Sequence, residues 1–338
     1  MPFQLNPSKV PIWNNETDLR FGLNDEPQVL KDVSNAQERL INLLFQGIPE
    51  DQLDLIGESV GLNPMETESF IERLKPSLLN PTSLKGSGTA VDVRFAEIIR
   101  IGFETNNTPE SVLANRAETL IQLPSLNRTG LLLIKALSEA GFRVFETHDY
   151  EFVRREDLGE LSYQPNQLGI SKLAAARQML AKHSNQIQLV HPQERSKRKP
   201  KVIALSAMHR INPSSYRELN AAHIAVEYGI SYLRVSPMIV PGESACLGCR
   251  DLWESESNPA WASVAIQLTA RNDHLDDGAG LLFATAIAAK SICQYVDGSG
   301  LSEPEGFQVS LKTRAVQNFS WAFHPNCYCK TKRPKLNR

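Results

Sequence analysis

Apolar and polar residues alternate in two different ways along the first part of the chain. Three short runs, KVPIW, DLRFGL and QVLKDV, have the pattern of strands separated by polar turns. Three stretches with apolar residues at helical spacing follow. The first begins with a capping box of Ser34 and Gln37, and the third begins with the Asn63-Pro64 pair, both of which are typical of helix starts. Three strands followed by three short helices predict a winged-helix-like module over residues 1–80.

A different pattern begins after residue 80. Gly, Pro, Ser and Thr concentrate in NPTSLKGSGT, so we expect residues 81–114 to be a linker and a helical connection. Strand and helix patterns then alternate. TLIQL, RVFET, KVIALS and SYLRVSPMIV are expected strands, while LLLIKALSEAG and SSYRELNAAHIAVEYG are expected helices. This alternation predicts an α/β domain with a parallel sheet over residues 115–330.

The end of the chain has its own pattern. Two further expected helices, PAWASVAIQL and GAGLLFATAIAAKSICQYVDG, precede an expected hairpin of GFQVSLKT and AVQNFSW. Residues 331–338 are basic and lack an apolar pattern. We expect them to form a disordered tail.

Composition narrows the classes of protein to consider. The 338 residues carry a formal charge of −2, which argues against a general attraction to nucleic acid or membrane surfaces. No apolar run reaches the roughly 18 residues that a membrane span needs. The first residues, MPFQLNPSKVPIW, lack the features of a secretory signal. We therefore expect a cytoplasmic protein.

Four of the five cysteines form two close pairs. Cys246 and Cys249 make a CxxC, and Cys327 and Cys329 make a CxC. In a reducing compartment such pairs are more typical of metal ligands than of disulfides. Two thiolate pairs on separate turns would complete the tetrahedron of a structural zinc ion, Zn²⁺. Four unrelated thiols, or a disulfide or redox pair, are the alternatives. Cys293 lies in an apolar helix and is expected to be a buried core residue.

The expected strand, turn and helix around LPSLNRTG lie where an α/β fold would hold a nucleotide phosphate. Only Gly130 occupies a glycine position of a GxGxxG loop, and Pro124 lacks an N–H donor. Arg128 could supply positive charge. Glu146 or Asp149, after the second strand, could bind ribose hydroxyls, but each could equally be a carboxylate at the end of a strand.

These features occur in the order typical of the ThiF family, relatives of the ubiquitin-activating enzymes. The segment FETHDYEFVRREDLGELSYQPNQLGISKLAAARQML resembles the part of that family after its second strand. Gly169 and Lys172 stand where the family has a glycine and an ATP-contacting lysine. The cysteine pairs resemble the family's zinc knuckle. The resemblance covers residues 115–330 and implies a Rossmann-like fold, a zinc ion, an ATP and Mg²⁺ site and, since ThiF relatives often dimerise, a homodimer.

Two longer motifs are similar to one branch of this family. VPGESACLGCRDLWESESNPAWASVAIQL and HPNCYC resemble ThiF-like proteins associated with cyclodehydratases in peptide azoline (thiazole/oxazole-modified microcin) maturation, and their actinobacterial relatives. In that branch a small N-terminal winged-helix module resembles a leader-peptide recognition element. The resemblance implies this role for residues 1–80, with a peptide or protein as one partner and a cyclodehydratase-type enzyme as another.

The chain departs from the ThiF pattern where that family acts on ATP. The glycine loop is degenerate, and Arg154 and Arg155 come too early to replace the adenylating arginine. KVIALSAMHR lacks the aspartate that would hold magnesium. Adenylate formation depends on positive groups and a metal at the triphosphate. The departures predict a non-catalytic ThiF-like protein that binds a peptide or protein partner and presents it to a modifying enzyme.

Two other functions stay open at this point. An ATP-dependent adenylyltransferase, activating a carboxyl or amide group, would work with Lys172, Arg128 and Asp149. A DNA-binding regulator would use the winged helix and the basic run SKRKPK. Glu66 and Glu68 in the third expected helix would repel phosphates, which disfavours the regulator.

Overall fold

The computed structural model divides the chain into two compact units, Met1–Asn115 and Arg116–Arg338, each with a hydrophobic core of its own. The described residues are 3–6, 9–22, 28–79, 97, 100–101, 104–105, 107–183, 186–194, 199–271, 273–298 and 305–330. The Gly- and Ser-rich stretch 80–89 and the tail 331–338 lie outside them.

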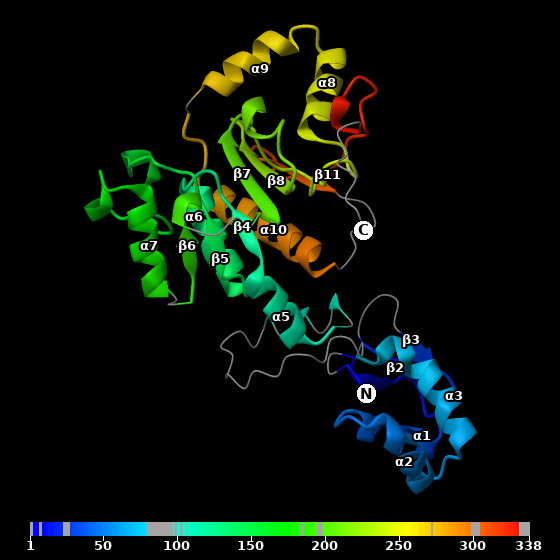
Figure 1. Cartoon of the computed structure of the whole chain (residues 1–338). Coiled ribbons are helices and arrows are strands. Elements are labelled where there is room, and N and C mark those ends of the chain that lie inside the picture. The colour runs from blue at the N-terminus through cyan, green and yellow to red at the C-terminus, as the bar shows by residue number, and fades with distance from the viewer. Residues whose placement is uncertain are drawn as a thin grey trace. The chain divides into compact units, whose positions relative to one another are not determined.

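Among its described residues, the first unit contains a small sheet and three helices that follow it, and it also includes the greater part of a later helix, α5 (Pro109–Glu118) (Figure 1). Its strands are β1 (Pro11–Trp13), β2 (Leu19–Phe21) and β3 (Gln28–Leu30), and its helices are α1 (Asn35–Leu44), α2 (Leu53–Val60) and α3 (Pro64–Leu74). The strands are antiparallel in the order β1-β2-β3. All six elements lie in the runs that predicted them. That they form a winged helix stays a prediction.

The helix starts of this unit follow the capping residues. Ser34 Oγ accepts a hydrogen bond from Gln37 N, and Gln37 Oε1 accepts one from Ser34 N, which completes the predicted capping box. Asn63 and Glu66 make the same reciprocal pair at α3. The helices place apolar side chains such as Leu44 in the core, where they meet the sheet.

The second unit is built on one sheet of mixed direction. Its strands are β4 (Leu120–Gln122), β5 (Val144–Glu146), β6 (Gln188–Val190), β7 (Val202–Met208), β8 (Ala222–Tyr228), β9 (Tyr232–Val235), β10 (Gly306–Ser310) and β11 (Val316–Phe319). Their order is β11-β10-β9-β8-β7-β4-β5-β6. The pairs from β6 to β8 are parallel, and those from β8 to β11 are antiparallel.

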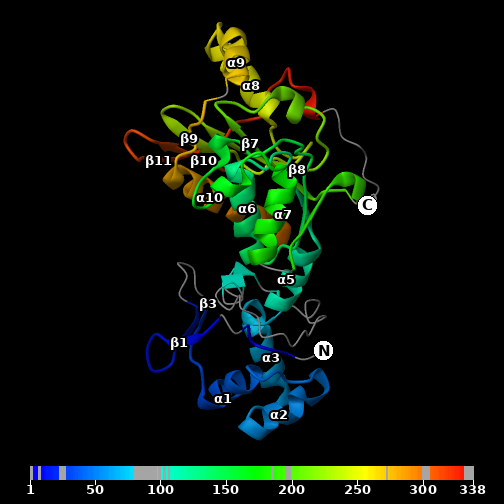
Figure 2. The same cartoon turned by 90° about the vertical axis from the view of Figure 1, so that its left-hand side faces the viewer.

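The helices of this unit are α5 (Pro109–Glu118, shared with the end of the first unit), α6 (Arg128–Glu139), α7 (Lys172–His183), α8 (Leu247–Ser257), α9 (Trp261–Ala270) and α10 (Gly278–Asp297). Helices α6 and α10 pack against each other, and α10 also contacts β8 and β9 (Figure 2). The 3-10 turn η7 (Pro213–Ser215) is followed by Tyr216 and Leu219, which pack in a second cluster with alternate residues of β7 and β8.

The strand order creates a switch point beside β4. The chain moves from β4 through β5 to β6 on one side, and then returns to β7 on the other side of β4. In open α/β sheets such a reversal leaves a crevice outside the carboxyl ends of the two diverging strands. The turn 123–127 follows β4, and His209 and Arg210 follow β7.

Two expectations about this sheet are wrong. The sheet is not wholly parallel, because Gly229 begins a tight turn that returns the chain from β8 as antiparallel β9. The helix expected over 214–229 is replaced by η7 and the strand β8. All seven residues of β8 are buried. A short, continuous apolar run is compatible with a central strand or a buried helix, and periodicity alone does not separate the two.

Helix α10 is long and apolar enough to cross a membrane by length and composition, the only such helix among the described residues. Its side chains argue for a different role. Leu281, Ala284, Ala288 and Ile292 are buried in the core of the second unit. Small residues along α10 let it lie close to α6, so it is a core helix of the α/β unit.

Candidate functional site

The four paired cysteines come together. Cys246 precedes α8 and Cys249 lies in its first turn, while Cys327 precedes the 3-10 turn η8 (Tyr328–Lys330) and Cys329 lies within it. Their sulfur atoms all lie within 4.8 Å of one another. The Sγ–Sγ distances are 4.0 Å for Cys246–Cys249, 3.6 Å for Cys246–Cys327 and 3.4 Å for Cys249–Cys329.

This arrangement could hold a metal ion. Two sulfurs bound at 2.3 Å to a tetrahedral zinc stand about 3.8 Å apart, which is close to the distances found here. Burial and then the neighbouring thiols raise the pKa of Cys246. Burial also raises that of Cys329, to about 11. A bound cation would offset both effects, since metal binding requires thiolates. Trp321 supports the turn, because its indole N–H donates to Cys246 O at 2.9 Å.

His324 and Cys293 lie apart from the sulfur cluster. His324 Nε2 is 2.9 Å from Glu256 Oε1, and its ring packs edge-on against Trp253. Cys293 is buried in α10, as expected. The cluster therefore consists of the four cysteines that the spacing singled out.

A separate cavity of about 420 Å³ lies at the carboxyl ends of β4 and β7, at the switch point of the sheet. Its lining includes the turn after β4, the segment around η4 (Arg155–Asp157), the first residue of α7 and the connection from α9 to α10. This is where the sequence placed a nucleotide phosphate.

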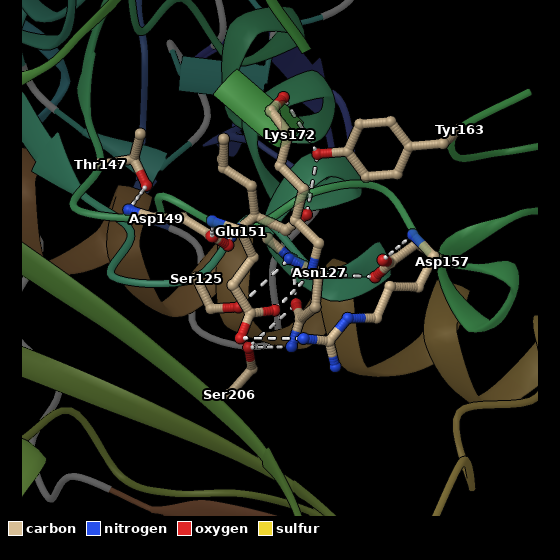
Figure 3. A network of polar contacts seen from close by, with 12 residues as sticks. Ser125, Asn127, Thr147, Asp149, Glu151, Asp157, Tyr163, Lys172 and Ser206 are labelled. Carbon is tan, nitrogen blue, oxygen red and sulfur yellow. Dashed lines mark hydrogen bonds and ion pairs between the residues drawn. The ribbon is translucent and has the colours of Figure 1, made fainter. Parts of the chain in front are cut away.

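The first turn of α6 is already capped from within the chain. Asn127 Oδ1 accepts a hydrogen bond from Gly130 N at 2.9 Å, and Asn127 Nδ2 donates to Ser206 Oγ at 3.0 Å (Figure 3). A Cβ built on Gly130 would lie 2.2 Å from Ser125 O. The glycine is thus explained by the close approach of the turn to its own helix. A phosphate at this helix end would compete with Asn127 for the same N–H.

Asp149 and Glu146, the two carboxylates that could bind ribose hydroxyls, already accept hydrogen bonds from other groups of the chain. Asp149 is buried, and its two oxygens accept from Leu126 N at 2.7 Å and Glu151 N at 2.8 Å (Figure 3). Glu146 is buried and accepts from Gln122 Nε2 at 3.1 Å. Asp149 therefore fixes the turn after β4 to the segment after β5.

Lys172, the first residue of α7, forms ion pairs with two carboxylates. Its Nζ lies 3.2 Å from Asp157 Oδ1 and 3.3 Å from Glu151 Oε2, and the side chains of Lys172 and Asp157 are nearly inaccessible (Figure 3). Lys172 and Arg128 thus line the cavity, whereas Gly130, Glu146 and Asp149 are not among its lining residues, and the charge of Lys172 is already paired. Gly169 lies before it with φ of +77°, a conformation that favours glycine.

Tyr163 is also part of this network. Its hydroxyl donates to Leu126 O at 2.8 Å, so the tyrosine also holds the turn after β4 (Figure 3). Burial, followed by the charges of Asp149 and Asp157, raises the pKa of Tyr163 far above its usual value. The hydroxyl stays neutral and acts as a donor.

Arg128 projects from the first turn of α6 toward the connection before α10. Its Nη1 donates to Asp276 O at 2.8 Å and lies 3.6 Å from Asp276 Oδ1, while its Nε is buried without a hydrogen-bond partner among the described residues. Burial raises the pKa of Asp276, although the charge of Arg128 opposes this.

Sequence reasoning discounted Arg154 and missed two further cationic residues of this cavity, Arg210 and Arg271. Arg154, Arg210 and Arg271 line it together with Arg128 and Lys172. Their charges face the acidic residues of the same lining, which are Glu151, Glu156, Asp157 and Asp276. The arginines come from three distant segments, and only the strand order that places β7 beside β4 could have indicated their proximity.

Comparisons with known proteins agree with this fold. No family model matches the chain, and no curated protein matches its sequence. Among solved structures, that of E. coli MccB is similar with a TM-score of 0.72 and 12% identity, covering 99% of this chain and 98% of that chain. The microcin C7 biosynthetic enzyme MccB in complex with N-formylated MccA has a TM-score of 0.68, with 12% identity over 98% of this chain and 100% of that one.

A third structure, that of PaaA, has a TM-score of 0.56 and 13% identity, and the match covers 79% of this chain and 95% of PaaA. E. coli MccB has also been solved with ATP. At these identities the likeness concerns the fold. The ThiF-like fold expected from the sequence is confirmed, and its particular branch stays a prediction.

Proposed function

We propose that this protein is a ThiF-like protein that binds a peptide partner and presents it to a modifying enzyme, without adenylating the partner itself. The main support comes from the switch point, where the groups that would bind a nucleotide are already bound to other groups of the chain. Asn127 caps α6, Asp149 accepts two backbone N–H groups, and Lys172 is paired with Asp157.

The strand β7 lacks the aspartate that would hold magnesium near the phosphates, and this supports the same proposal. Ser206, in the carboxyl-terminal half of β7, lines the cavity, and it is hydrogen-bonded to Asn127. Phosphoryl and adenylyl transfer depend on a metal ion and preorganised cations at the phosphates. An ATP molecule would have to displace Asn127, Asp157 and Glu151 from their partners before Lys172 could reach a phosphate.

Peptide binding is supported by the first unit and by one protein of similar structure. The small sheet ends in the edge strands β1 and β3, where Trp13 and Val29 are exposed. An extended peptide can pair with such an edge through main-chain hydrogen bonds. E. coli MccB, which shares the fold, has been solved in complex with MccA. The proposed role of residues 1–80 is therefore to recognise a peptide by strand addition.

The remaining parts of the proposal follow the resemblance to ThiF-like proteins. The four cysteines would hold a structural zinc ion, and the modifying partner would be a cyclodehydratase-type enzyme. The protein would be cytoplasmic and homodimeric. Cys246, Cys249, Cys327 and Cys329 would then play no chemical part, because a zinc ion with four protein ligands has no open position.

Peptide selection tests the proposal. The full chain, loaded with zinc, is used to select binders from a random peptide display library, and their affinities are measured by fluorescence anisotropy. Val29→Asp should weaken the selected peptides at least tenfold, because a charge at the edge disfavours strand pairing. Leu55→Asp is the matched control, since Leu55 is an exposed apolar residue of α2, away from the sheet. Equal weakening by both variants would contradict strand addition.

Adenylation is the second candidate, and one observation favours it. Arg128, Arg154, Lys172, Arg210 and Arg271 all line a cavity that lies where α/β folds bind nucleotides. Release of pyrophosphate from ATP and Mg²⁺ in the presence of a selected peptide would establish this activity. Its absence with several selected peptides would support the non-catalytic proposal.

A further inference from the structure

A second and larger cavity lies on the other side of η7. It has a volume of about 1280 Å³ and is enclosed by the segment after η7, the helices α8 and α9, and the turn that carries Cys327 and Cys329. Figure 1 shows α8 and α9 lying together above β7 and β8. Neither the four-cysteine cluster nor the switch-point cavity explains this volume.

An ion pair with unused hydrogen-bonding capacity lies in its lining. Arg210 Nη2 is 2.5 Å from Asp251 Oδ2, and the hydroxyl of Tyr216 donates to the same oxygen. Arg210 Nη1 donates to Thr269 Oγ1 at 3.1 Å. The ion pair is electrically neutral, yet it leaves Arg210 Nε and Asp251 Oδ1 buried without hydrogen-bond partners among the described residues.

Two more lining residues, Trp261 and His223, each have a buried polar atom without a hydrogen-bond partner in the described part of the chain. These atoms are Trp261 Nε1 and His223 Nε2. His223 Nδ1 lies 3.1 Å from Ala221 O and acts as its donor, and burial lowers the pKa of His223, so its Nε2 is an acceptor. A buried polar atom without a partner costs about 1–3 kcal/mol, and native proteins contain few of them. Four around one cavity point to a ligand.

The rest of the lining selects the kind of ligand. Leu219, Ile239, Leu252 and Ile266 provide apolar surface between the polar atoms, and Ile266 is 71% exposed although it belongs to an apolar helix. Apolar cavities with a few unpaired donors and acceptors are typical of ligand sites. The ligand should be neutral, with an apolar group flanked by both hydrogen-bond donors and acceptors.

We propose that this cavity binds one apolar residue of a peptide chain together with its two neighbouring peptide groups. The peptide carbonyls would accept from Arg210 Nε and Trp261 Nε1, and a peptide N–H would donate to Asp251 Oδ1. The apolar side chain would lie against Leu252 and Ile266. All of these polar atoms are covered in the structure, so the side chains over them must shift when the residue binds.

The inference rests on the proposed function only in taking a peptide as the ligand. The site is distinct from the edge of the small sheet and from the switch-point cavity. Arg210, Asn212 and Thr269 line both cavities of the second unit. A residue bound here would therefore lie next to the place where the fold would hold a reacting group.

Titration with a single-residue probe tests the site. N-acetyl-L-leucinamide contains one apolar side chain and two amide groups, and its binding to the zinc-loaded full chain is followed by saturation-transfer NMR. We expect a dissociation constant of roughly millimolar size for so small a ligand. Trp261→Phe, which removes one donor and keeps an aromatic side chain, should weaken binding about fivefold.

The controls separate the site from general effects. Trp253→Phe is the matched variant, because the indole of Trp253 already donates to Ala322 O and does not line the cavity. It should leave the affinity for the probe unchanged, and so should Val29→Asp in the first unit. N-acetyl-L-aspartic acid α-amide, whose side-chain carboxylate is charged, should not bind.

Two results would overturn the inference. One is the absence of binding of N-acetyl-L-leucinamide up to its solubility limit. The other is equal affinity for wild type and Trp261→Phe when both proteins have the same melting temperature. Either result leaves the proposed function intact if selected peptides still bind and are weakened by Val29→Asp. Loss of the selected peptides alone would instead count against the proposed function.

Discussion

Lys172 Nζ lies 3.2 Å from Asp157 Oδ1, and the side chains of both residues are almost wholly buried. The residue that the ThiF resemblance assigns to ATP is thus a member of an internal ion pair. Its charge stabilises the segment between β5 and α7.

Removing one member of this pair should destabilise the second unit. Lys172→Met leaves the carboxylate of Asp157 buried without its cation, and such a loss typically costs about 3–5 kcal/mol. Urea unfolding would measure it. The double variant Lys172→Met with Asp157→Asn should recover part of the loss. Lys75→Met is the control, since Lys75 pairs with Glu72 at the surface and should contribute little. A wild-type stability for Lys172→Met would show that the pair is not structural.

Gly130→Ala tests why a glycine lies in the first turn of α6. The added methyl group would meet Ser125 O at 2.2 Å, so the turn or the helix must shift. We expect a loss of about 1–3 kcal/mol, as for other overpacked sites. Gly278→Ala is the matched helix variant, because a Cβ there meets nothing within 4 Å. It should change the free energy of unfolding by less than about 1 kcal/mol. Similar effects of the two substitutions would contradict the packing explanation.

The cysteine cluster should bind one zinc ion per chain. Metal analysis of purified protein measures the stoichiometry, and Cys246→Ser should lower it well below one. Cys293→Ser provides the control, because Cys293 is buried in α10 outside the cluster. Chelation should also lower the melting temperature, since metal binding to the folded state contributes directly to stability. Full zinc occupancy in Cys246→Ser would exclude that residue as a ligand.

Stability should fall with acid partly through Glu227. Burial opposes ionisation of Glu227, but the guanidinium of Arg250, whose Nη1 lies 2.7 Å from Glu227 Oε2, holds its pKa below the ordinary value. The unfolded state therefore binds more protons than the folded state near pH 4. The stabilisation is complete above the ordinary carboxyl pKa and disappears as the pH falls through the folded pKa.

Unfolding free energies measured between pH 7 and pH 3 would show this effect. Glu227→Gln should be less stable than wild type at pH 7, and the difference should shrink toward pH 3. Glu58→Gln, at an exposed position of α2, should follow the wild-type profile. A constant gap between wild type and Glu227→Gln across the whole range would contradict the assigned linkage.

The sequence predicted those parts of the molecule whose signals are local. The capping boxes at Ser34 and Asn63 placed two helices because side chain and backbone satisfy each other within four residues. The cysteine spacing identified the sulfur cluster, because two short turns restrict where the four thiols can lie. Local geometry was sufficient in each case.

Long-range properties were not predicted. The strand β8 was assigned to a helix, because its buried run has no distinctive period. The pairing of Lys172 with Asp157, and the approach of Arg210 to both cavities, depend on strand order and loop packing. Strand order and loop packing determine whether a nucleotide site is open. A sequence motif shows only which residue types are present.

Calorimetric titration of zinc-loaded protein with ATP and Mg²⁺ tests the central claim most directly. E. coli MccB, which has been solved with ATP, is the positive control under the same conditions. We expect no binding tighter than the millimolar range, because the groups at the switch point are already bound to other groups of the chain. Binding in the micromolar range would contradict it, and the cationic lining of that cavity would then be a working nucleotide site.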